Sequence, residues 1–164
     1  MNVTTRRRIA ACAVALAVPA LASCAGSPEQ TDLAYTPGAG VNDRTGSVDV
    51  LHALVVSDSD GSGTVVAALV NNDDENDDGL AQVAGAGEDE SVQAQSTATT
   101  PVEAGGAVQL ADEGNVLVTG EQIQPGRFVN LTFSFERGES VTMMVPVVSR
   151  TGDYADVPVS SGSE

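Results

Sequence analysis

The clearest pattern of hydrophobic and polar positions lies near the end of the chain, at residues 127–136 (RFVNLTFSFE). Apolar and polar side chains alternate there residue by residue, which is the period of a β-strand with one buried and one solvated face. A short turn at Arg137-Gly138-Glu139 then leads into residues 140–148 (SVTMMVPVV), where Val141, Met143, Val145 and Val147 share one face. These two segments predict an antiparallel hairpin. Pro146 has no N–H to donate, so we expect the second strand to be bulged or at an edge near its end.

Earlier segments show the same short apolar runs separated by turn residues. Residues 47–57 (SVDVLHALVVS) are mostly apolar on both faces, which predicts a central strand, and residues 64–71 return from a Gly-rich turn as its hairpin partner. Further strands are expected at 80–84, 91–96, 106–110 and 115–119. Seven or eight short strands at this spacing predict an all-β fold, an antiparallel β-sandwich spanning residues 47–148.

The segments on either side of the expected domain lack any period. Residues 24–46 are rich in Gly, Pro, Asp and Thr, which is typical of a flexible tether, and residues 149–164 revert to Ser, Gly and Asp. We therefore expect a disordered N-terminal tether and a disordered C-terminal tail.

Residues 1–23 have the organisation of an export signal. Arg6, Arg7 and Arg8 precede an uncharged apolar run that is too short to span a bilayer. The run ends in Leu21-Ala22-Ser23-Cys24, which resembles the bacterial lipobox. That resemblance implies cleavage between Ser23 and Cys24 and a diacylglyceryl or palmitate group on Cys24, so that the membrane partner is reached through an N-terminal lipid. An ordinary secretory signal is the alternative, and both the general secretory and the twin-arginine export routes stay open.

Composition adds constraints on partners and stability. The chain has 23 acidic and 7 basic residues and a formal charge of −16. Nucleic acid and anionic head groups require cationic patches, so neither is an expected binding surface. Of the two cysteines, Cys12 lies in the export signal, so the mature chain has no disulfide and depends on packing.

No arrangement of residues indicates catalysis, and we expect no enzyme. A nucleophile triad needs a base, yet His52 is the single histidine, and the chain has no Gly-x-Ser-x-Gly elbow, no phosphate-binding loop and no Cys-x-x-Cys motif.

One acidic segment offers a metal hypothesis. Asp74, Asn76, Asp78 and Gly79 fit the opening of a calcium loop, where alternate carboxylates converge on the ion. Gly85 stands where a bidentate Glu should close such a loop, so any calcium affinity would be weak. A plain acidic hairpin loop is the other interpretation.

The order of segments is similar to a known family. A strand ending in Leu69-Val70-Asn71-Asn72, a later Asp78-Gly79-Leu80, and a Gln-Pro-Gly, Phe-Glu-Arg-Gly and Val-Pro-Val series over residues 124–147 resemble actinobacterial envelope lipoproteins of the LpqE type. These are related to the periplasmic copper chaperones called PCuAC. The resemblance implies a cupredoxin-like β-sandwich over roughly residues 46–148.

The family's copper ligands are His and Met side chains, which suit Cu(I), and they do not carry over. The first His falls near Gln95, and the His and Met of the Gly-Gly-x-His-x-Met segment fall near Val116 and Val118. A rearranged site from His52, Met143 and Met144 is conceivable, although a lone His or Met on a strand more often packs or hydrogen-bonds.

Three functions follow from these observations. The first is a lipid-anchored, non-enzymatic binding or structural module on the outer side of the cytoplasmic membrane. It would have a copper-chaperone-like scaffold without copper ligands, no cofactor, and envelope protein partners that the sequence does not identify. The alternatives are a copper carrier with a rearranged site and a calcium-dependent adhesion or assembly module.

Overall fold

A computed structural model describes residues 38–59, 61–95, 99–113 and 116–158 of the chain. They belong to one compact unit, Gly38–Glu164, which contains the whole described core. The predicted export signal, Cys24 and most of the predicted tether lie outside the described residues.

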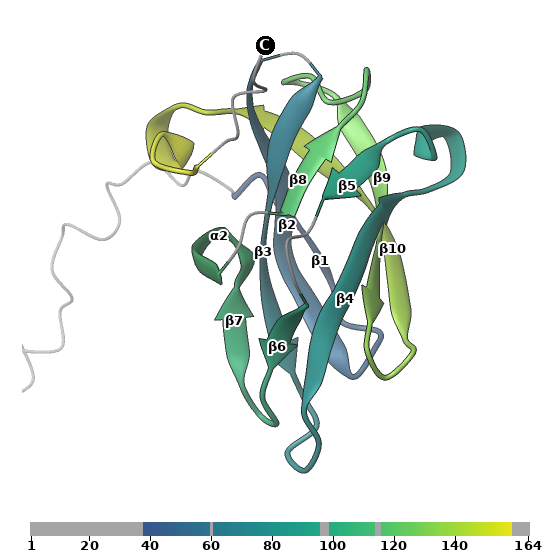
Figure 1. The fold of residues 1–164 in the computed structure, drawn as a ribbon. Coiled ribbons are helices and arrows are strands. Elements are labelled where there is room, and N and C mark those ends of the chain that lie inside the picture. Colours follow the sequence, from purple (N-terminus) through teal and green to yellow (C-terminus); the bar gives the residue numbers. More distant parts are fainter. Residues whose placement is uncertain (1–37, 60, 96–98, 114–115, 159–164) are drawn as a thin grey trace, which may run out of the picture. The chain divides into compact units, whose positions relative to one another are not determined.

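The described residues are dominated by strands, which confirms the predicted all-β class (Figure 1). The strands run along one curled sheet in the order β5-β8-β3-β2-β10-β9-β4-β6, with β1 added to β2 and β7 to β3. Their bounds are β1 Val41–Asp43, β2 Val48–Ser59, β3 Ser62–Asn71, β4 Asp78–Gly85, β5 Gln93–Gln95, β6 Thr100–Val102, β7 Ala107–Gln109, β8 Val116–Thr119, β9 Phe128–Phe135 and β10 Ser140–Ser149. The helical pieces are η2 Gly87–Asp89, α2 Leu110–Glu113 and η3 Gly152–Tyr154.

The curled sheet forms two layers that meet along β10. The first layer holds β5, β8, β3 and β2 with β1 and β7, and the second holds β10, β9, β4 and β6. Residues 140–146 of β10 pair antiparallel with β9, whereas Val147–Ser149 pair in parallel with Val55–Ser57 of β2. Pro146 therefore lies where β10 changes partners, a place where a missing N–H donor is tolerated. This parallel pair is the one departure from the expected antiparallel pairing among the described strands.

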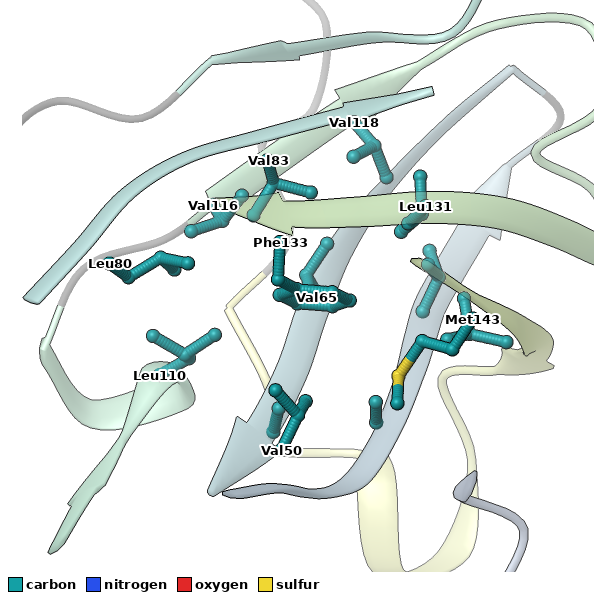
Figure 2. Close-up of a cluster of buried hydrophobic side chains, with 14 of the residues drawn as sticks. Val50, Val65, Leu80, Val83, Leu110, Val116, Val118, Leu131, Phe133 and Met143 are labelled. Carbon is teal, nitrogen blue, oxygen red and sulfur yellow. The ribbon is translucent and has the colours of Figure 1, made fainter. Parts of the chain in front are cut away.

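The core lies between the two layers and consists mainly of β-branched and Leu side chains (Figure 2). The alternation in β9 is confirmed, because Val129, Leu131 and Phe133 are fully buried while the residues between them are not. Burying a Val, Leu or Phe side chain stabilises a fold by roughly 1.5–3 kcal/mol. Such packing must stabilise the described residues without a disulfide, because they contain no cysteine.

Two short elements lie where the sequence indicated only flexible ends. β1 falls inside the expected tether and pairs with β2, from Val41 opposite Ala53 to Asp43 opposite Val50. Residues 149–158, expected as part of the disordered tail, continue β10 to Ser149 and form η3. The sequence does not predict either element, because both consist largely of polar and small residues. Contacts with β2 and β3 hold them in place.

The C-terminal segment 150–158 explains why β2 is apolar on both faces. Leu54 and Val56 are fully buried but lie outside the main core cluster. Val56 pairs with Thr64 of β3, and the Thr64 hydroxyl donates to the Pro158 carbonyl at 2.7 Å. The segment thus reaches the outer face of β2 and β3. β2 is a central strand, as predicted, because it lies between β3 and β10.

Candidate functional site

The residues near which the resemblance places the family's copper ligands lie on the paired strands β5 and β8. Gln95 is opposite Leu117, and Ala94 is opposite Val118. Residues directly opposite one another in an antiparallel pair point to the same face, and neighbours along a strand point to opposite faces. Gln95 consequently projects on the face of Leu117, away from the face that Val116 and Val118 share.

Val116 and Val118 are core residues. Both are 0% exposed and belong to the main core cluster together with Val92 and Ile123, which lie in neighbouring segments (Figure 2). Their side chains contain no atom that can bind a metal, and Gln95 on the outer face does not converge with them. This end of the fold is therefore built from apolar packing.

His52 lies in a bulge of β2, with an exposed side chain. The register of β2 against β3 shifts between Leu51 and Leu54, and His52 has φ = 54°, in the left-handed region. The His52 backbone N–H donates to the Asn42 side-chain oxygen at 2.6 Å, and its ring Nε2 is hydrogen-bonded to the Tyr154 hydroxyl at 3.3 Å. His52 thus links β1, β2 and η3.

Glycines on the N-terminal side of β1 make this arrangement possible. A Cβ at Gly40 would stand 2.5 Å from the His52 carbonyl carbon, and one at Gly38 would stand 2.7 Å from ring atom Cε1. Only a residue without a side chain permits such an approach. The close packing indicates that the bulge and the start of β1 form one structural unit.

Met143 and Met144 point to opposite faces of β10. Met143 is 9% exposed and packs in the core, as Figure 2 shows, whereas Met144 is 58% exposed on the outer face. On β2, residues 50–53 pair with β1, and β10 joins β2 only from Val55. The two sulfur atoms therefore lie on different faces of β10. His52 contacts β1 and η3 instead.

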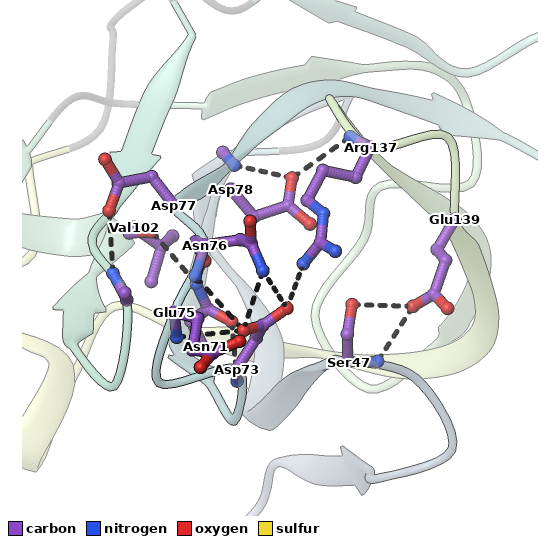
Figure 3. Close-up of polar contacts among 12 residues, drawn as sticks. Ser47, Asn71, Asp73, Glu75, Asn76, Asp77, Asp78, Val102, Arg137 and Glu139 are labelled. Carbon is purple, nitrogen blue, oxygen red and sulfur yellow. Dashed lines mark hydrogen bonds and ion pairs between the residues drawn. The ribbon is translucent and has the colours of Figure 1, made fainter.

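The acidic loop after β3 is organised around Asp73, a residue outside the predicted calcium set. Its carboxylate accepts the backbone N–H groups of Glu75 at 3.0 Å and Asn76 at 3.1 Å, the Asn76 amide, and Arg137 Nη1 at 2.6 Å (Figure 3). The Glu75 N–H, followed by the Arg137 guanidinium and the Asn76 amide, lowers the pKa of Asp73 to about 2. Asp73 is thus the acceptor that closes the loop, and Arg137 supplies the opposing charge.

The predicted calcium residues have separate positions in this loop. Asp74 is exposed, and the Asn76 amide donates to Asp73. Asp78 is 4% exposed, and its Oδ1 accepts the N–H groups of Gly79 at 2.7 Å and Arg137 at 3.2 Å. The hydrogen bond to Asp73, followed by the charges of Asp73, Asp78 and Glu139, raises the pKa of Arg137, so the guanidinium offsets the acidic groups around it. The arrangement is that of a structural clasp between the loop and the β9–β10 turn.

A second contact ties the same turn to the start of β2. Glu139 accepts both the backbone N–H and the hydroxyl of Ser47 at 2.8 Å, and these bonds lower its pKa (Figure 3). Together with Asp73 and Arg137, this contact fixes the end of the hairpin to the first layer. We call Ser47, Asp73, Asp78, Arg137 and Glu139 the polar clasp.

Sequence reasoning missed the residues that matter most in the clasp. Asp73 accepts the N–H groups of Glu75 and Asn76, two and three residues further along the chain, a pattern typical of an Asx turn. Arg137 is one of the few cations in a strongly acidic chain, and its place in a hairpin turn marks it as a charge partner. The calcium hypothesis selected Asp74, Asn76 and Asp78 as ligands from their spacing alone.

The described residues lack two further features, a metal-binding cluster and a membrane-spanning helix. Within the described ranges, no group of three or more His, Cys, Asp or Glu side chains is arranged to hold a metal ion. In the same part of the chain, no helix is both long and apolar enough to cross a membrane.

Comparison with known proteins identifies the fold. No protein-family model and no curated protein matches the sequence. Among solved structures, the chain is similar to the copper-bound PCuAC domain from PmoF2, with a TM-score of 0.53, 19% identity, and coverage of 66% of this chain and 98% of that one. The apo PCuAC domain from PmoF1 gives a TM-score of 0.52 and 16% identity, with coverage of 66% of this chain and 99% of that one. The apo PmoF2 PCuAC domain gives a TM-score of 0.53 and 18% identity, with coverage of 68% of this chain and 98% of that one. These likenesses confirm the predicted cupredoxin-like sandwich.

The polar clasp predicts how acid acts on stability. Asp73 has a folded-state pKa of about 2 against an ordinary value of 3.8, so the stability it contributes is present above about pH 4 and is lost as the pH falls toward 2. We expect Asp73→Asn to lower the melting temperature at neutral pH and to flatten its decline in that window. Thermal unfolding followed by circular dichroism from pH 7 to pH 2 measures both effects.

Asp74→Asn is the matched control, because it removes the same charge from the neighbouring exposed position. The explanation fails if the two variants have the same pH profile.

Proposed function

We propose that this protein is a lipid-anchored, non-enzymatic module of the cell envelope that keeps a PCuAC-like scaffold without its copper ligands. The observation that carries the proposal is the complete burial of Val116 and Val118, near which the resemblance places a His and a Met of the family. Valine side chains there support apolar packing in place of metal binding. The scaffold is then available for binding or structural roles that do not involve copper.

The anchor is proposed from the sequence. Leu21-Ala22-Ser23-Cys24 supplies the cleavage site before Cys24 and the thiol for the lipid. Residues 25–37 would then connect the lipid to the domain that begins at Gly38. Two or three acyl chains hold a protein at a membrane much more firmly than one, so the module would stay on the extracytoplasmic face of the cell membrane.

A copper carrier with a rearranged site is the second candidate. It is favoured by the exposure of His52 and Met144, an imidazole and a thioether that suit Cu(I). Met143 can take part only by leaving the core, so this candidate requires a partly repacked domain.

Copper binding separates these two candidates. We expect the chain from residue 25 onward, which lacks Cys24 and its thiol, to leave Cu(I) with a chromophoric chelator. Met143 is in the core and Met144 is exposed on the opposite face of β10, so the two sulfur atoms cannot bind one ion together. The measurement is a Cu(I) competition titration of the wild type, His52→Ala and Met144→Ala.

Thr142→Ala is the matched control, since Thr142 is exposed on the same face of β10 but has no sulfur or imidazole. Stoichiometric competition that is lost in His52→Ala or Met144→Ala, and kept in Thr142→Ala, would establish the carrier instead.

The two cysteines of the full chain test the anchor. Cys24→Ala should move the protein from the membrane fraction to the soluble fraction of the cell envelope and abolish incorporation of labelled palmitate, because the acceptor thiol is gone. Cys12→Ala is the control, since that cysteine lies inside the segment expected to be removed. Membrane retention of Cys24→Ala would contradict the anchor without affecting the copper result.

A further inference from the structure

A cavity of about 430 Å³ lies at the end of the domain where the turn between β2 and β3 meets the loop between β8 and β9. It is lined by Gly61, Glu121, Gln124 and Arg127. Small-molecule sites in proteins usually measure about 300–1,000 Å³ and contain a few polar groups that orient the ligand. The cavity is therefore large enough for a small organic molecule, and three of its four lining side chains are polar or charged.

Backbone hydrogen bonds fix the walls of this cavity. The Gly61 N–H donates to the Ile123 carbonyl at 2.8 Å, and Ile123 itself is fully buried in the core. The Arg127 N–H donates to the Gln124 carbonyl at 3.1 Å, and the Arg127 carbonyl accepts the Val147 N–H at 2.8 Å. The segments that carry the lining side chains are thus held in place before any ligand binds, which lowers the entropic cost of binding.

The two charged residues of the cavity have no partners in the described part of the chain. Arg44, Arg137 and Arg150 each form an ion pair with an aspartate, whereas Arg127 forms none. An arginine without an acidic partner is unexpected in a chain with 23 acidic and 7 basic residues. Glu121 lines the same cavity and likewise forms no ion pair among the described residues. A cation and an anion therefore line one cavity without pairing with each other.

We propose that this cavity binds a small zwitterion, a molecule with one carboxylate and one ammonium group, such as a free amino acid or a dipeptide. The Arg127 guanidinium donates to the ligand carboxylate, for which its planar geometry is suited. The Glu121 carboxylate accepts hydrogen bonds from the ligand ammonium, and the Gln124 amide can donate or accept. This inference is independent of the proposed function, because it requires neither a lipid nor a metal.

The charge of the whole chain favours a zwitterion over a simple ion. A simple anion is repelled by a protein with a formal charge of −16, and a simple cation leaves Arg127 without a partner. A zwitterion has no net charge and satisfies both side chains. Because Glu121 and Arg127 are exposed, each contact is weak, so we expect a dissociation constant in the millimolar range that rises with salt.

A nuclear magnetic resonance titration of the ¹⁵N-labelled chain from residue 25 onward tests this proposal. The described core lies within Gly38–Glu164, so this chain contains the folded unit. The probes are L-alanine and L-alanyl-L-alanine, which differ in the distance between their two charges. We expect saturable shifts of the amide signals of Gly61, Gln124 and Arg127 with at least one probe. Acetate and methylammonium, which each carry one of the two charges, should bind at least about fivefold more weakly.

Two variants test the assigned roles. Arg127→Gln and Glu121→Gln should each raise the dissociation constant of the zwitterion by at least about fivefold, because each removes one of the two charge-assisted contacts. Arg44→Gln and Glu75→Gln are the matched controls. They remove the same charges at exposed positions near the opposite end of β2 and β3 and should leave binding unchanged.

Circular dichroism melts of each variant show whether the fold is intact. The absence of saturable shifts with both zwitterions overturns the proposal. Equal weakening by Arg127→Gln and Arg44→Gln, or by Glu121→Gln and Glu75→Gln, also contradicts it. Acetate that binds as tightly as the zwitterions would exclude a role for Glu121 and overturn the assignment of the ligand class.

Discussion

Burial of β-branched side chains between the two layers is the constraint on which the rest of the structure depends. The mature chain that the sequence predicts has no disulfide, so packing of apolar side chains must hold the layers together. β10 makes this possible because it pairs with β9 and then with β2, which joins the layers along one strand. Val116 and Val118 belong to the same packing. A metal ligand at either position would compete directly with the core, since an unpaired polar group costs free energy when it is buried.

The charges of the chain are distributed around this core in a way that bears on function. The carboxylates of the polar clasp lie near the β9–β10 turn, where they pair with the Arg137 guanidinium and accept backbone N–H groups. The acidic loop is therefore a structural element.

The sequence predicted the parts of the fold in which local pattern and tertiary contact agree. Alternation located β9, and apolar residues on both faces identified β2 as central, because each pattern reflects burial directly. β1 and η3 were missed because partners distant in sequence, such as Asn42 and Tyr154 around His52, hold them in place. The opposite orientation of Gln95 and the valines required the register of β5 against β8. Similarly, motif spacing pointed to Asp74, whereas hydrogen-bond geometry shows that Asp73 organises the loop.

We propose that Val116 and Val118, near which the resemblance places copper ligands, serve here as core. The most direct test is the free energy of unfolding of Val116→His combined with Val118→Met, measured by denaturant titration without copper. Leu117→His, on the opposite and half-buried face of β8, is the control. We predict a loss of at least about 2 kcal/mol for the double variant, more than for the control, because the inserted imidazole is buried without a partner. Unchanged stability of the double variant would contradict the claim.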